Sequence, residues 1–196
     1  MVLSLEKGQK VELEKGLTKI KVALGWDTQK YQGAASFDLD ASAFLLDKQG
    51  KLASEEDIIF YGMQKTPDGK LAHKSGSIIH SGDDLTGGGD KDNEIITVEL
   101  DKVPSIVDKI VFAVTIYEWE KRKQNMGMVS KSFTRIVDAT TNKELLRYDL
   151  GEDYSTQTSV VVAEVYKHNG DWKFHAVGQG IHGGLKDIIK SYGLPV

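Results

Sequence analysis

The feature that most constrains the fold of this chain is that its apolar residues come in short runs separated by turn residues. The longest apolar stretches, Ile110–Tyr117 and Val160–Tyr166, have the length of a β-strand and fall far short of the ~18 residues that a membrane-spanning helix needs. Segments such as Thr66–Gly69, in which proline and glycine suit a tight turn, separate the runs. This pattern is typical of a sandwich built from many short strands.

The predicted strands number roughly ten, and one short helix is expected at Leu185–Tyr192, where apolar residues recur at helical spacing. The charged segment Glu118–Met128 has no clear period and is predicted to be an exposed loop. The whole chain, residues 1–196, is predicted to be one all-β domain with minor helix: an antiparallel β-sandwich with a short C-terminal helix. The predicted strands are Val11–Glu14, Leu17–Trp26, Ser36–Leu46, Ile58–Tyr61, Ser77–His80, Ile95–Leu100, Lys109–Tyr117, Val129–Asp138, Glu144–Leu150, Thr158–Tyr166 and Trp172–Val177.

The strand at Ser36–Leu46 carries two aspartates on one face. Asp38 and Asp40 alternate with apolar residues, so both side chains are expected to stand on the same side of the strand, about 6.5–7 Å apart. In isolation, the simpler interpretation is the solvent-exposed face of an amphipathic strand. A second acidic segment later in the chain favours a metal site shared between the two.

That second segment, Asp83–Glu94, carries five carboxylates against the single cation Lys91, together with three consecutive glycines. Two like charges ~4 Å apart repel by roughly 1 kcal/mol in water and by about 4 kcal/mol at an intermediate effective dielectric. A hard divalent cation removes this repulsion, because Ca²⁺ prefers about 6–8 oxygen ligands. The segment is therefore predicted to bind calcium, and a solvated polar loop is the alternative. Its carboxylates are Asp83, Asp84, Asp90, Asp92 and Glu94.

Several other functional motifs fail on their spacing or context. An EF-hand template started at Asp90 places Ile95 where the turn glycine belongs. The G-x-G-x-x-G motif at Gly178–Gly183 lacks the strand–helix–strand context of a dinucleotide site, and we expect a tight turn into the last helix there. The chain has no cysteine, which excludes disulfides and thiol catalysis. A metal-dependent hydrolase is a further alternative, with His80 as its candidate base.

Charge and composition bear on partners and location. A net charge of -4 gives no electrostatic reason to expect nucleic-acid binding, and no small-molecule substrate site is evident. The N-terminal residues Met1–Leu5 run directly into charged residues, so no signal peptide is expected. The lack of cysteine suits a reducing cytoplasm. The basic stretch Trp119–Lys123 is expected to be an exposed charged loop, with contact to acidic lipid headgroups as the alternative.

The acidic segment and several others resemble those of one known protein family. Gly82–Glu94 resembles the calcium-loop signature of TerD-type tellurium-resistance and stress proteins, usually written GDNxTGxGxGDDE. The resemblance implies a C2-like β-sandwich that binds two neighbouring calcium ions and has no catalytic activity. It also implies a cytoplasmic role in resistance to tellurite and other stresses, alongside sister TerD-type proteins and at the inner membrane face. Further segments that resemble the family, in order along the chain, are Leu24–Asp27, Phe37–Phe44, Lys109–Ile116, Arg147–Leu150 and Trp172–Gly180.

The predicted calcium site combines the two acidic segments. Relative to the signature, Asp84 stands in place of Asn, Asn93 replaces an acid, Lys91 replaces a glycine and Gly88 replaces a common acid, and these departures bear on the affinity of one of the two sites. The alternative function is a calcium-gated adaptor that contacts an anionic membrane or a protein partner. The predicted ligands are the side chains of Asp38, Asp40, Asp83, Asp84, Asp90, Asp92 and Glu94 and the carbonyl oxygens of Leu85, Gly87 and Gly89.

Overall fold

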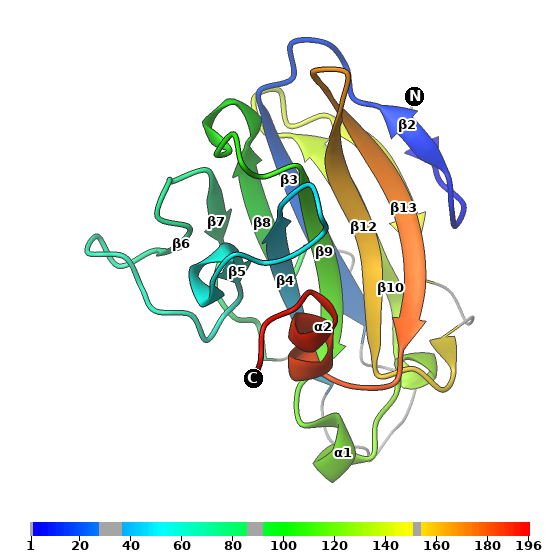
Figure 1. Cartoon of the computed structure of the whole chain (residues 1–196). Helices are drawn as coiled ribbons and strands as arrows, with labels where there is room; N and C mark the ends of the chain where they lie inside the picture. The colour runs from blue at the N-terminus through cyan, green and yellow to red at the C-terminus, as the bar shows by residue number, and fades with distance from the viewer. Residues whose placement is uncertain (1, 28–36, 86–91, 151–153) are drawn as a thin grey trace.

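The short apolar runs form strands that pair into two sheets, as the computed structural model shows for residues 2–27, 37–85, 92–150 and 154–196 (Figure 1). Neighbouring strands are antiparallel, except that β1 runs parallel to β11. The seven-stranded sheet has the order β1 (Leu3–Ser4), β11 (Glu144–Asp149), β10 (Ser130–Asp138), β3 (Lys19–Asp27), β8 (Glu94–Glu99), β7 (Ile78–His80), β6 (Leu71–Ala72). The six-stranded sheet has the order β2 (Lys10–Glu12), β13 (Asp171–Ile181), β12 (Ser159–His168), β9 (Lys109–Ile116), β4 (Leu39–Leu46), β5 (Ile58–Ile59).

Helical structure is minor among the described residues. Two α-helices, α1 (Trp119–Arg122) and α2 (Leu185–Ser191), lie toward the same end of the sandwich in Figure 1. Three 3-10 turns complete the helical elements: η1 (Glu55–Asp57), η2 (Leu100–Lys102) and η3 (Met126–Met128). None of the helices in the described ranges has the length and apolar character to span a membrane. The predicted all-β sandwich with a short C-terminal helix is confirmed.

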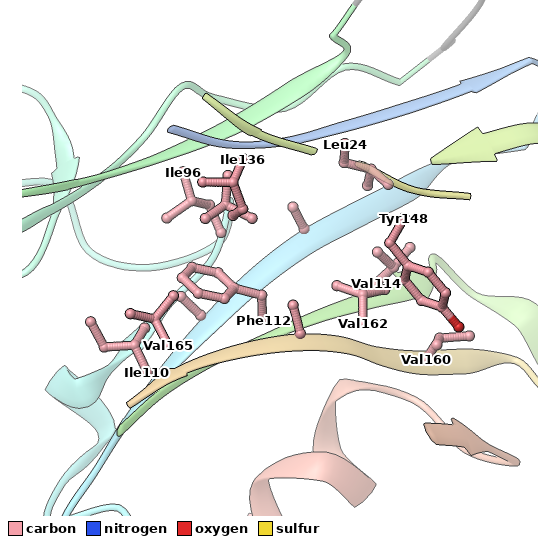
Figure 2. Close-up of a cluster of buried hydrophobic side chains, with 14 of the residues drawn as sticks. Leu24, Ile96, Ile110, Phe112, Val114, Ile136, Tyr148, Val160, Val162 and Val165 are labelled. Carbon is pink, nitrogen blue, oxygen red and sulfur yellow. The ribbon is translucent and has the colours of Figure 1, made fainter. Parts of the chain in front are cut away.

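The main core lies between the two sheets. Leu24, Ile96 and Ile136 from the seven-stranded sheet meet Phe112 and Val162 from the six-stranded sheet (Figure 2), and all five are buried. Within a strand the residues that face this core lie two positions apart, as the alternation of side chains along a β-strand requires.

A second, smaller core lies on the outer face of the six-stranded sheet. There α2 places Ile188 and Ile189 against Phe44 of β4, Val111 of β9 and Val161 of β12. The middle of this sheet is therefore buried on both faces, which explains why the central strand β9 is apolar at nearly every position. The helix is part of the folded core rather than a terminal appendage.

Two local expectations were wrong. Strand β13 continues through Ile181, past Gly178, where a turn into the helix was expected. Gly178 has a φ of 60° and lies opposite a register shift between Val161 and Ala163 of β12, so the glycine accommodates a bulge within the strand. Segment Glu118–Met128, expected to be a loop, contains α1 and η3.

We predict that Ile188→Ala lowers the free energy of unfolding by about 2–5 kcal/mol, because it removes a fully buried side chain and leaves a cavity. Chemical denaturation measures this change. Lys186→Ala, on the exposed side of the same helix, should change stability by no more than about 0.5 kcal/mol. An Ile188→Ala effect as small as that of the control would show that α2 contributes nothing to the core.

Candidate metal centre

Three carboxylates meet at one end of the sandwich. Asp38 immediately precedes β4, Asp40 lies within β4, and Asp83 follows β7. One oxygen of each lies within 4.8 Å of the others. Two oxygens that share a calcium ion, each 2.3–2.6 Å from it, can be at most about 5.2 Å apart. The three side chains are therefore close enough to share one cation.

Asp38 and Asp40 are buried, which contradicts the interpretation of their face, taken in isolation, as solvent-exposed. Asp38 and Asp40 each retain only 4% of their accessible surface. They line a cavity of about 370 Å³ whose other walls include Tyr61, Tyr117 and Leu85. Alternation along the strand placed the two aspartates on one face, but distant residues cover that face.

The carboxylates destabilise one another's charged forms. Burial raises the pKa of Asp40 to about 8, and the negative charges of Glu94, Asp38 and Asp83 add to the shift. Burial also raises the pKa of Asp38, although the Arg122 guanidinium opposes this. The pKa of Tyr61 is raised to about 12 by burial and then by Asp40. A cation that entered this cavity would relieve the repulsion.

Glu94 and His80 hold the strand that carries Asp40. The Glu94 carboxylate, which is fully buried, accepts hydrogen bonds from the backbone N–H of Ala41 at 2.6 Å and of Asp84 at 3.2 Å. His80 Nε2 lies 3.0 Å from the Ala41 carbonyl oxygen. Strand β5 pairs with β4 only at residues 43 and 44, so these two side chains bond the backbone edge that a longer neighbouring strand would have covered. Glu94 thus ties both acidic segments together.

The remaining described side chains of the acidic segment make other contacts. Asp84 Oδ2 accepts a hydrogen bond from Asn93 Nδ2 at 3.1 Å, and Asn93 Oδ1 accepts one from the Trp26 N–H at 3.2 Å. Asp92 forms a bidentate ion pair with Arg135, with both N–O distances at 2.8 Å. These bonds attach the segment to β3 and β10 and fix its path toward the cavity.

The structure therefore divides the predicted ligands into groups. It gathers Asp38, Asp40 and Asp83 around one point, whereas the carboxylates of Asp84, Asp92 and Glu94 take part in the hydrogen bonds and ion pair described above. The side chain of Leu85, predicted to contribute its carbonyl, is 59% exposed and lines the cavity. The predicted ligands that lie outside the described residues are Gly87, Gly89 and Asp90.

Sequence reasoning missed Arg122, Tyr61 and Tyr117 as residues of this centre. Arg122 Nη2 lies 3.4 Å from Asp38 Oδ2, and its guanidinium lies 5.1 Å from the centre of the Tyr117 ring. The signal for Arg122 was its place in the basic stretch Trp119–Lys123, which was interpreted as an exposed loop.

The donor set fits a hard divalent cation. All three converging groups are carboxylates, the oxygens that Ca²⁺ prefers. Asp38 Oδ1 is buried and has no hydrogen-bond partner among the described residues, and an unpaired buried carboxylate oxygen is costly unless something positive binds it. The residues present can therefore accept calcium.

Comparison with known proteins identifies the family that this chain resembles. The TerD domain model matches residues 1–192. General stress protein 16U of Bacillus subtilis (strain 168) is 52% identical over 199 residues, which cover 100% of both chains. Tellurium resistance protein TerD of Serratia marcescens is 47% identical and covers 99% of this chain and 98% of its own. The crystal structure of a TerD homologue from Streptomyces coelicolor A3(2) has a TM-score of 0.71 at 20% identity, covering 92% of this chain and 100% of its own, which supports the fold.

We predict that Asp40→Asn stabilises the metal-free protein. An unfolded aspartate titrates near 3.9, whereas folding raises the pKa of Asp40 to about 8. The folded state therefore holds the proton more tightly, so wild-type stability falls as the pH rises from about 4 to about 8. Asparagine carries no charge and avoids this loss. In thermal melts with EDTA at about pH 8, the variant should melt higher than wild type by at least 2–4 °C, the shift that roughly 1 kcal/mol produces in a chain of this length.

The matched control is Asp101→Asn, which removes a carboxylate from an exposed position in η2. Its effect on the melting temperature should be small. A metal-free Asp40→Asn protein that melts below wild type at every pH would contradict the claim that the Asp40 charge is held at a cost to stability.

Proposed function

The chain belongs to the TerD family, and on that premise we propose that it is a non-enzymatic calcium-binding protein of the stress-response type. The observation that supports calcium binding most strongly is the convergence of Asp38, Asp40 and Asp83 within 4.8 Å, with Asp38 Oδ1 left unpartnered among the described residues. In this proposal Ca²⁺ neutralises the cluster and stabilises the end of the sandwich.

The three carboxylates would supply the side-chain ligands of one calcium ion. Because Ca²⁺ takes about 6–8 oxygens, backbone carbonyls and water would complete its coordination. Glu94 and His80 would act indirectly by fixing β4 through Ala41. The family resemblance also implies a second, neighbouring ion, with ligands from the same two acidic segments.

The biological role follows from the relatives. Two of them carry the names general stress protein and tellurium resistance protein, and we propose that this chain serves in tellurite resistance or a general stress response in the cytoplasm. We further propose that it works with sister TerD-type proteins. A pull-down with and without Ca²⁺ tests that partnership.

We expect calcium to stabilise the protein by about 2.7 kcal/mol at a hundredfold excess over Kd, which corresponds to a rise in Tm of roughly 5–10 °C. Asp38→Asn should lose most of this gain, because it removes a charge from the cluster, whereas Asp101→Asn should keep it. Thermal melts in EGTA and in millimolar calcium, with calorimetric titration of the same variants, measure both effects. Identical wild-type melting temperatures in EGTA and calcium would falsify the proposal.

A second candidate function is the calcium-gated adaptor that contacts an anionic membrane. Two large apolar side chains are exposed beside the aspartates: Leu85 at 59% and Tyr117 at 38%, and both line the same cavity. Exposed apolar groups next to a bound cation suit a surface that carries anionic headgroups above an apolar layer.

The adaptor function predicts calcium-dependent sedimentation with vesicles that contain phosphatidylserine and none with pure phosphatidylcholine vesicles. Leu85→Ser should reduce this binding, whereas Ile106→Ser, which alters another exposed apolar residue that does not line this cavity, should not. If the protein binds calcium but stays in the supernatant with both vesicle types, the membrane adaptor is excluded and the plain calcium binder is retained.

A further inference from the structure

A positively charged side chain already lies against the aspartate cluster. Among the described residues that line the cavity, Arg122 is the cation, and its Nη2 lies 3.4 Å from Asp38 Oδ2. The guanidinium also lies over the face of Tyr117, whose backbone N–H donates to the Asp38 carbonyl at 3.0 Å. Arg122 thus partly neutralises the carboxylate that the proposed calcium ion would need.

The helix that carries Arg122 is short and bounded by unfavourable backbone conformations. Helix α1 has four residues, far fewer than a helix needs to be stable on its own. Its flanking residues, Glu118 and Lys123, have φ angles of 49° and 53°, a left-handed region that non-glycine residues rarely adopt. Helix α1 therefore depends on its tertiary contacts, and the ion pair between Arg122 and Asp38 is one of them.

We propose that Arg122 competes with calcium for Asp38. Bound calcium displaces the Arg122 guanidinium from this carboxylate, and the displacement loosens α1. This inference rests on the proposed calcium site. A divalent ion and a guanidinium that approach the same carboxylate repel each other, and the ion, which also engages Asp40 and Asp83, has the larger interaction with the cluster. Calcium therefore favours the state in which Arg122 has left, and a ligand shifts an equilibrium through such a difference in affinity.

The consequence reaches a larger neighbouring cavity. A space of about 600 Å³ lies between α1 and α2 and is lined by Trp119, Lys121 and Lys186. Asp40, Tyr61 and Tyr117 line both this space and the cavity that holds the aspartates. Loosening of α1 would therefore change the shape of the larger cavity. Calcium binding would in this way alter the surface of the protein between α1 and α2.

The first test is the calcium affinity of Arg122→Gln, measured by calorimetric titration of the full chain. Because removal of one positive charge beside a divalent ion relieves direct repulsion, the variant should bind calcium at least roughly tenfold more tightly than wild type. Arg122→Lys retains the charge and should lie nearer to wild type. Lys121→Gln removes the same charge from the adjacent residue, which is 77% exposed, and should change affinity less than about twofold because of solvent screening.

The second test is amide hydrogen exchange of α1, where the N–H groups of Arg122 and Gln124 bond to the carbonyls of Glu118 and Trp119. Calcium should speed exchange of this segment in wild type while it slows exchange at residues 81–85. In Arg122→Gln the α1 amides should exchange fast already without calcium. Melting temperatures without calcium confirm that each variant is folded.

The outcomes separate this inference from the proposed function. If no variant binds calcium and residues 81–85 show no protection, the calcium site itself is wrong and the inference falls with it. If wild type binds calcium but Arg122→Gln binds no more tightly, or α1 exchange stays constant or slows, then Arg122 does not compete and the calcium site remains. Tighter binding by the variant together with faster exchange of α1 in wild type supports the displacement.

Discussion

The burial of negative charge at one end of the sandwich is the constraint that organises this structure. Asp38, Asp40 and Glu94 are each at most 4% exposed, although carboxylates removed from water are costly unless they are paired. Glu94 obtains its partners from two backbone N–H groups. Among the described residues, the burial of the Asp38 and Asp40 carboxylates is not compensated to the same extent. A bound cation would therefore stabilise this end of the sandwich.

The position of these uncompensated carboxylates follows from an incomplete sheet edge. Strand β5 covers only part of β4, so the backbone of Ala41 faces β8 and β7 instead of a neighbouring strand, and Glu94 and His80 bond to it. The two sheets are thereby joined beside Asp40. Because the same Glu94 carboxylate also bonds the Asp84 N–H, the two acidic segments are held in a fixed relation, and a cation between them acts on both sheets at once.

The sequence predicted the strands and the acidic residues better than it predicted their surroundings. A period-2 run identified β4, because its inner face repeats every second residue, and the same rule placed Asp38 and Asp40 on one side of that strand. A continuous apolar run identified β9. It did not show that this side is buried, because Tyr61 and Leu85, which cover it, are far away in the sequence. For the same reason the hydrogen bond between Glu94 and the backbone of Ala41 could not be predicted, because 53 residues separate the two. Side-chain roles that depend on long-range contacts lie beyond pattern reasoning.

We propose that the carboxylates of Asp38, Asp40 and Asp83 share a cation. Anomalous diffraction from a crystal grown in calcium, collected at a long wavelength, tests it most directly. We expect an anomalous peak between these three side chains, with oxygen distances of about 2.3–2.6 Å. A well-ordered cluster with no peak, or a calcium ion bound only elsewhere on the molecule, would contradict it.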